Sequence, residues 1–389
     1  MLILKDKDET FIEVDCYQHG ATKDFALSNI YLHRRNKDHI IAILCDGGSN
    51  DIMSHIKASM AASMAVNSEL YDIMDIAKTV VNFITSDKSS NVSFSLLRIF
   101  NDMRAEMVEH QAPPVLIFND HKAISIKRQK IKLKTSSGDA LVYKSNFTAK
   151  KGYMMLSFTK GVVSSGKGSH RIPNGWSNDA IKSYVLSNIN KNISARKLSH
   201  LLITKAVSND LFQAKNDMSS LAIYIRKPRK ILICTGPPYN KNDDVTLAEK
   251  VKNYDGDVII SGGTTASIIS RELDRDVHVV LNKLTRGLPP KSEMEGVTLV
   301  TEGVLTLNKV KERLTEMKVS AIKGNGTDIE IINKILEHDI IEFIVGTRIN
   351  ALHQNPNIPT ELAIRRNVVK DIAHQLQDKF MKGVTIQYL

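Results

Sequence analysis

Three aspartates beside predicted strands could bind a divalent cation. Asp46 ends an apolar run at residues 39–45 and is followed by two glycines, which allow a tight turn with an exposed backbone carbonyl. Asp24 precedes a run that could pair with that strand, and Asp217 immediately precedes another strand-like run. Carboxylates beside a free carbonyl are the hard oxygen ligands that Mg²⁺ and Mn²⁺ prefer. Each aspartate alone also fits an ordinary turn or cap, so only their order along the chain favours a metal site.

A lysine occupies a fourth position of interest. Residues 153–158 are predicted to form a strand, residues 159–161 to break it, and residues 162–163 to resume it. A strand that ends in an acidic residue followed by glycine is a common way to present a carboxylate to a metal. The residue before the glycine is Lys160. It is either an ordinary surface lysine or a cation in the place of a carboxylate, and the residues alone leave both interpretations open.

The order of these segments resembles a known family. The matching stretches are "KDF…SNIYLHRRNKDHIIAILCDGGSND", "SFSLLRIFND…AEMVEHQAPPVLIFND", "GDALVYKSNFTAKKGYMMLSFTKGVV" and "NDMSSLAIYI". Taken in this order along the chain, they resemble the segments of the SpoIIE-type metal-dependent phosphatases, the bacterial branch of the type 2C (PPM) serine/threonine protein phosphatases. The resemblance covers residues 1–226 and implies an α-β-β-α sandwich, a signalling role and a phosphoprotein substrate.

The resemblance also implies roles for individual residues. Asp24 matches the aspartate at the second metal, Asp46 the aspartate that bridges both metals, and the Gly47 carbonyl a further ligand. Asp217 matches the last aspartate, at the first metal. The remaining family ligand is the aspartate of a Ser-Asp-Gly turn, and Lys160 stands in its place. The implied cofactor is Mn²⁺ or Mg²⁺, with the first of the two positions altered.

Replacing that carboxylate by an ammonium changes the local charge by two units. At 4–6 Å from a divalent ion this opposes metal binding by roughly several kcal/mol, even at an effective dielectric constant near 20. We therefore expect the ammonium of Lys160 to lie between Asp46 and Asp217. Two functions remain open: a serine/threonine phosphatase of weakened activity, and a pseudophosphatase that binds a regulatory partner without turning it over.

The C-terminal part has its own candidate, the segment "SGGTTA" at residues 261–266. It follows the strand-like "DVII" and precedes the helical "SIISREL". Gly262 and Gly263 would let backbone N–H groups face a ligand, Thr264 or Thr265 would cap the helix, and the helix N-terminus would favour an anion. The spacing matches no nucleotide-binding motif, and a plain capped turn remains the alternative.

Two further loops are expected at the same sheet edge. They are "TGPP", after the first strand of this part, and "HQNP", which carries His353 and Asn355 before the last long helix. Parallel strands bring their carboxyl ends to one edge, where open sheets bind ligands. These loops resemble the C-terminal extension of some SpoIIE-type phosphatases. The loops predict a small anionic ligand. The resemblance of this extension implies an architecture and no particular activity.

The elements around these residues predict two domains. Residues 1–226 show many strands in meander-like succession with helical patterns at 51–85 and 177–206, which is typical of an α+β domain. Residues 227–230 form a basic, proline-containing linker. Residues 231–389 alternate strand and helix, which predicts a Rossmann-like α/β domain with a mainly parallel sheet.

Composition narrows the class of protein. A hydrophobic content of 42% and a charged content of 24% are those of a globular protein, and no apolar run reaches the roughly 18 residues that span a membrane. Three widely spaced cysteines predict a reducing cytoplasm rather than disulfides. Residues 1–228 carry a net charge of +10 and the remainder +1, which fits either an ordinary solvated surface or an anionic partner. No basic stretch is interleaved with aromatic residues as in nucleic-acid grooves.

Overall fold

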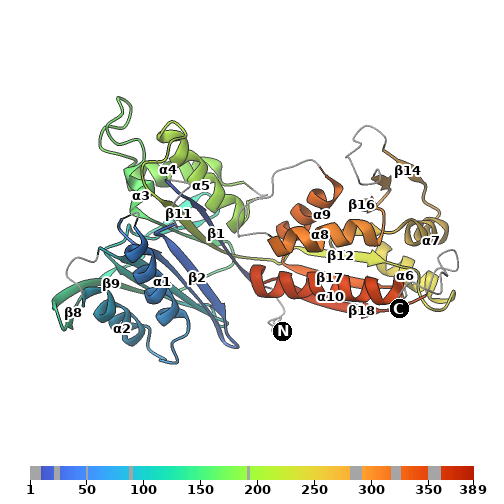
Figure 1. The fold of residues 1–389 in the computed structure, drawn as a ribbon, viewed down its shortest axis with the longest axis horizontal. Coiled ribbons are helices and arrows are strands. Elements are labelled where there is room, and N and C mark those ends of the chain that lie inside the picture. The colour runs from blue at the N-terminus through green and yellow to red at the C-terminus, as the bar shows by residue number, and fades with distance from the viewer. Residues whose placement is uncertain are drawn as a thin grey trace. The chain divides into compact units, whose positions relative to one another are not determined.

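The computed structural model describes residues 10–21, 27–49, 51–86, 91–190, 193–280, 291–316, 326–348 and 361–389, with the backbone alone at 361–363. The chain divides into two compact units (Figure 1). The N-terminal unit is Leu2–Lys227 and the C-terminal unit is Pro228–Leu389.

Two antiparallel sheets form the N-terminal unit. The first has the order β1 (Phe11–His19), β11 (Met218–Arg226), β10 (Tyr153–Phe158), β6 (Leu116–Asn119) and β7 (Lys122–Ile124). The second has the order β2 (Ile30–Arg35), β3 (His39–Asp46), β4 (Ser93–Phe100), β5 (Arg104–His110), β9 (Gly138–Thr148) and β8 (Gln129–Thr135). Their apolar inner faces share one core.

Helices cover the outer face of each sheet, which gives the four layers seen in Figure 1. The helices on the second sheet are α1 (Ile52–Val66) and α2 (Ile73–Thr85). Those on the first sheet are α3 (Lys160–Ser164), α4 (Asn178–Asn188) and α5 (Ala195–Asn209). The four longer helices each begin at a side chain that accepts a hydrogen bond from the first turn, namely Asp51, Asp72, Ser177 and Ser194.

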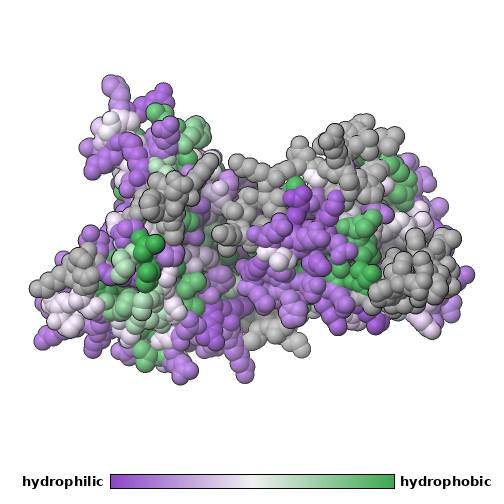
Figure 2. Space-filling view, in the orientation of Figure 1, coloured by the Kyte–Doolittle hydropathy of each residue, from purple (hydrophilic) through white to green (hydrophobic). Residues whose placement is uncertain are grey.

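Helix α1 is apolar on both faces. Four alanines pack toward the sheet, whereas Ile52, Met53, Ile56 and Met60 are exposed. Figure 2 shows hydrophobic residues at the surface where Figure 1 draws α1. The helix directly follows the turn after Asp46, so this apolar face begins next to the candidate metal site.

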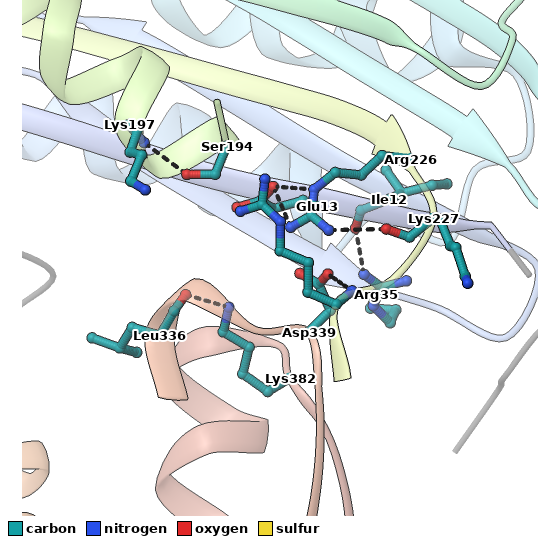
Figure 3. Close-up of polar contacts among 11 residues, drawn as sticks. Ile12, Glu13, Arg35, Ser194, Lys197, Arg226, Lys227, Leu336, Asp339 and Lys382 are labelled. Atoms are coloured by element: carbon teal, nitrogen blue, oxygen red, sulfur yellow. Dashed lines mark hydrogen bonds and ion pairs between the residues drawn. The ribbon is translucent and has the colours of Figure 1, made fainter. Parts of the chain in front are cut away.

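A buried ion pair joins β1 and β11 (Figure 3). The Nε and Nη2 atoms of Arg226 donate to one oxygen of Glu13, at 3.0 and 2.8 Å. The side chains are only 8% and 6% exposed, so if one charge is removed, water cannot solvate the charge that remains. Nearby, Nη2 of Arg35 donates to the carbonyl of Ile12 at 2.8 Å, which fastens β2 to β1.

The C-terminal unit has one seven-stranded sheet. Its order is β14 (Val277–Val279), β15 (Ser292–Met294), β16 (Val297–Thr301), β13 (Asp257–Ser261), β12 (Lys230–Thr235), β17 (Ile340–Val345) and β18 (Gly383–Tyr388). The five strands from β16 to β18 are parallel, and β14 and β15 are antiparallel additions at one end.

The chain builds this sheet outward from β12, first to β13 and β16 and then, on the other side, to β17 and β18. Helices α6 (Asp243–Lys252) and α7 (Gly263–Leu273) therefore pack on one face. Helices α8 (Val304–Glu316), α9 (Thr327–Glu337) and α10 (Glu361–Phe380) cover the opposite face. Right-handed crossovers that reverse direction must change face in this way.

Several predicted elements differ from the structure. Residues 162–163, predicted to resume a strand, belong to α3, because the chain turns into a helix at Lys160. The helical patterns at 51–85 and 177–206 each contain two helices. Strand β8 is mostly polar and exposed, which hides it from a hydrophobicity pattern.

All three cysteines, Cys16, Cys45 and Cys234, are buried and free. Burial raises the pKa of each thiol well above its ordinary value. Among the described residues no helix is both long enough and apolar enough to span a bilayer.

Candidate functional site

Asp46 lies at the end of β3 and joins two turns. Its Oδ1 accepts a hydrogen bond from the N–H of Gly48 at 2.9 Å, and its Oδ2 accepts one from the N–H of Lys160 at 3.0 Å. The residue is partly exposed. One carboxylate therefore holds the turn before α1 against the first residue of α3, and each oxygen retains a lone pair for a further partner.

Asp217 is buried and more fully engaged. Its Oδ1 accepts from the N–H of Ala21 at 2.9 Å. Its Oδ2 accepts from both the N–H and the hydroxyl of Ser28, at 2.7 and 2.9 Å. Three donors from the chain thus satisfy this carboxylate, which is 7% exposed. In this arrangement Asp217 holds Ala21 and Ser28 at the same carboxylate.

Ser28 connects the two aspartate positions, and the sequence had not marked it. Its carbonyl accepts the N–H of Gly47 at 3.2 Å while its own N–H and hydroxyl bind Asp217. A Cβ at Gly47 would lie 2.7 Å from the Ser28 carbonyl, so only glycine fits this approach without a shift. Its position two residues before β2 is the signal that could have pointed to it.

Lys160 does not make the contact expected of it. Its main-chain N–H, rather than its ammonium, meets Asp46. The side chain is exposed, and within the described ranges its Nζ forms no hydrogen bond or ion pair with Asp46 or Asp217. The physical reason is that Lys160 begins α3, where an N–H group has no intrahelical acceptor and takes a carboxylate instead.

Gly161 brings α3 onto the strand that follows Asp217. A Cβ at this position would lie 2.1 Å from the Asp217 carbonyl, so a side chain there would push the helix away.

The charge of Lys160 also affects the pKa of His110, on β5. The pKa of His110 is lowered, mainly by burial and additionally by the Lys160 charge, while its bond to the Leu141 carbonyl opposes the shift.

A polar layer lies between the sheets below these residues. The Thr159 hydroxyl accepts from Nδ2 of Asn29 at 3.3 Å and from the N–H of Ser219 at 3.0 Å. Buried hydroxyls of Ser95 and Ser157 have no hydrogen-bond partner in the described part of the chain. Because buried polar groups are normally paired, water is the partner expected for them.

The described residues do not form the first metal position that the resemblance implies. Among them no group of three or more His, Cys, Asp or Glu side chains could hold a metal ion. Lys160 supplies no carboxylate, and Oδ2 of Asp217 already accepts two protein donors, whereas Oδ1 accepts one. The second position would combine Asp46 and the Gly47 carbonyl with Asp24, which lies outside the described residues.

In the C-terminal unit, Gly262 and not a threonine precedes helix α7. The helix begins at Gly263 and no side chain caps it, so the prediction that Thr264 or Thr265 caps the helix is wrong. Both threonines fall inside the first turn because the helix starts earlier than its apolar pattern. His353 and Asn355 lie outside the described residues.

A cavity of about 680 Å³ opens on the face of β17 and β18 beside the end of α6. Two pairs of its polar side chains are hydrogen-bonded: the Tyr254 hydroxyl donates to Glu342 at 3.1 Å, and Nζ of Lys250 donates to Gln387 at 3.0 Å. Burial, followed by the Glu342 charge, raises the pKa of Tyr254 well above its usual range. None of the predicted site residues lines this cavity.

Solved structures similar to this chain include a phosphatase domain. The SpoIIE phosphatase domain of Bacillus subtilis is 12% identical, with a TM-score of 0.45, and the match covers 57% of this chain and 95% of that one. RsbX in complex with magnesium is 12% identical, with a TM-score of 0.41 over 57% and 98% of the two chains.

A Mycobacterium tuberculosis protein with RsbU and RsbW domains is 15% identical, with a TM-score of 0.46 over 62% and 67%. The matches with the first two structures span a little over half of this chain, and at these identities any likeness is one of fold alone. No family model matches the chain. No curated protein matches it either.

Proposed function

We propose that the N-terminal unit is a SpoIIE-type, metal-dependent serine/threonine phosphatase domain of weakened activity, acting on a phosphoprotein. The supporting observation is that Ser28 links Asp217 to the Asp46-Gly47 turn at one end of the sandwich. The weakening follows from Lys160, which offers an exposed ammonium where the family resemblance implies a carboxylate.

In this proposal Asp24, Asp46 and the Gly47 carbonyl hold a Mn²⁺ or Mg²⁺ ion. A bound ion of this kind neutralises phosphate charge and lowers the pKa of a bound water. Asp46 can serve because each of its oxygens accepts a single N–H. Asp217 acts by position: its bonds to Ala21 and Ser28 fix the two ends of the segment that carries Asp24.

A second function is a pseudophosphatase, in which the same unit binds a phosphorylated regulatory partner without hydrolysis. It is favoured by the missing carboxylate at Lys160 and by the two donors that Oδ2 of Asp217 already accepts. In either case the C-terminal unit would act as the sensor of a small anionic ligand.

The deciding experiment is hydrolysis of an aryl phosphate and of a phosphoserine protein during Mn²⁺ titration. We expect slow turnover in the wild type, at least tenfold faster turnover in Lys160→Asp, and none in Asp46→Asn. An aspartate at the first position of α3 also suits the helix dipole, so this variant should fold well. Lys167→Asp, another exposed lysine, is the matched control and should change nothing.

Rapid turnover in the wild type that Lys160→Asp does not increase would contradict the weakened site. Absence of turnover in both proteins, with retained binding of the phosphoprotein, would select the pseudophosphatase.

A further inference from the structure

Two helices begin side by side at the carboxyl edge of the C-terminal sheet. Helix α7 follows β13 and helix α8 follows β16, and these strands are parallel neighbours with Ser261 opposite Thr301. Because α7 packs on one face of the sheet and α8 on the other, their N-termini flank the same edge position. Each N-terminus carries N–H groups without intrahelical acceptors and a partial positive charge.

The two turns are held in close approach. The Ser261 hydroxyl is shared between the carbonyls of Glu302 and Gly303, at 3.1 and 3.3 Å, and the N–H of Gly262 donates to the Thr301 carbonyl at 2.8 Å. A Cβ at Gly303 would lie 3.5 Å from the Cα of Gly262. The main chains of the two turns therefore touch without intervening side chains.

The entrance to this edge is open. Gly263, the first residue of α7, is exposed, and a Cβ placed on it would have no atom within 4 Å. Gly262 precedes it with a φ of 131°, a conformation that side chains rarely adopt. No side chain caps the helix. An anion can thus approach the first turn of α7 directly.

Thr265 provides an independent indication of a ligand. The residue is 1% exposed, and its hydroxyl has no hydrogen-bond partner within the described residues. Its Oγ1 would lie 3.3 Å from a Cβ on Gly262, so it is directed at the start of the helix rather than into the apolar core. A buried hydroxyl left unpaired destabilises the fold, and a bound oxygen at this position would offset that cost.

We propose that this edge binds the phosphate group of a small molecule, with the hydroxyl of Thr265 and the first-turn N–H groups of α7 as donors. Glu302 is exposed on the neighbouring turn and opposes a high negative charge. A single phosphate group is therefore a better fit than a polyphosphate. The inference specifies the ligand that the proposed function gives to the C-terminal unit, and it does not depend on hydrolysis by the N-terminal unit.

The test uses the full chain in EDTA, so that no metal-dependent phosphate binding in the N-terminal unit contributes. Inorganic phosphate and methyl phosphate are titrated by calorimetry, and their effect on the amide resonance of Gly263 is followed in ¹⁵N-glycine-labelled protein. We expect saturable binding that shifts this resonance. Thr265→Val, which keeps the shape and removes the hydroxyl, should bind at least tenfold more weakly.

Two comparisons separate a binding role from a structural one. Thr265→Ser should bind as the wild type does, and Ser267→Ala, two residues further along the exposed side of α7, should be unaffected. Without phosphate, Thr265→Val should melt at or above the wild-type temperature, because it removes an unpaired polar group.

Three results would overturn the proposal: equal affinity of Thr265→Val and the wild type for phosphate, a clearly lower melting temperature of Thr265→Val, or no binding of either probe by the wild type. Hydrolysis of an aryl phosphate with Mn²⁺ is measured separately, so failure of one proposal leaves the other standing.

Discussion

In the N-terminal unit the candidate site is made of side chains, whereas in the C-terminal unit it is made largely of main chain. Asp46 and Asp217 bring negative charge to the ends of antiparallel strands, and four hydrogen bonds from backbone N–H groups hold them. At the edge of the parallel sheet, glycines bring the starts of α7 and α8 together, and the positive charge comes from the helices.

The difference decides what each site tolerates. A site made of carboxylates depends on the identity of every charged residue, so one lysine can change its chemistry. A site made of N–H groups depends on the open space in front of them, so one additional carbon can close it to a ligand without disturbing the fold. The following predictions test this contrast and begin with the largest effect.

Separating the two units is the strongest test. The chain divides between Lys227 and Pro228, and the sheets on either side share no strand. We expect residues 1–227 and 228–389, expressed apart, each to melt cooperatively. Calorimetry of both fragments measures this, and an unfolded fragment of either kind would show that the units depend on each other.

Removing the buried cation of the N-terminal unit should have the next largest effect. Arg226→Met leaves the Glu13 carboxylate buried and uncompensated, which should lower the free energy of unfolding by about 3–5 kcal/mol. The fluorescence of Trp176, the single tryptophan of the chain, reports unfolding of this unit alone.

The control for this change is in the other unit. Arg313 pairs with the buried Asp328 there, and Arg313→Met should leave the Trp176 transition unchanged. The double variant Glu13→Leu/Arg226→Met should recover most of the lost stability, because it removes both charges together. A double variant as unstable as Arg226→Met would mean that lost packing, and not the uncompensated charge of Glu13, causes the loss of stability.

The glycines of the two sites should respond differently to one added methyl group. Gly47→Ala places a Cβ 2.7 Å from the Ser28 carbonyl and 3.0 Å from that of Ser54, and should cost about 2 kcal/mol of stability. Gly263→Ala meets open space and should change stability by less than about 0.5 kcal/mol. Urea denaturation of both variants checks this, and equal losses would remove the distinction between the sites.

The smallest effect concerns acidity. Burial, followed by the Arg35 charge, lowers the pKa of His33 to about 4 from its ordinary value of 6.5. The unfolded chain then binds more protons than the folded one between these values, so stability is complete above pH 6.5 and falls as the pH decreases toward 4. Since His33 is only half-buried, we expect a loss of on the order of 1 kcal/mol between pH 7.5 and pH 5.

His33→Gln should remove this part of the pH dependence, and the exposed His121→Gln should not. The Trp176 transition in urea at both pH values is the measurement. An unchanged pH profile in His33→Gln would assign the acid sensitivity to other groups.

Much of the framework was accessible from the sequence. The strands that carry Asp46 and precede Lys160 were predicted because apolar runs bounded by glycines are strong local signals. The C-terminal part was expected to alternate strand and helix, and helices α6 to α10 are interspersed with its strands. Placement of the aspartates at strand ends followed from the same patterns.

The contacts within the site could not be predicted in this way. Ser28 and Asp217 are 189 residues apart, and no local pattern indicates that they bond. Helix α3 has only five residues, too few for a helical period, and its first N–H decides what Asp46 contacts. Similarly, the start of α7 depends on the geometry of Gly262 rather than on the polarity of the threonines that follow.

The placement of the cysteines gives each unit its own probe of local unfolding. Cys16 and Cys45 lie in the N-terminal unit and Cys234 in the C-terminal unit, all inaccessible in the folded state. A thiol reagent can therefore modify each only when its strand is transiently exposed, and the rate reports the free energy of that opening. Because β3 and β12 carry Cys45 and Cys234, alkylation read by mass spectrometry would show, in one intact chain, whether phosphate protects one strand and Mn²⁺ the other.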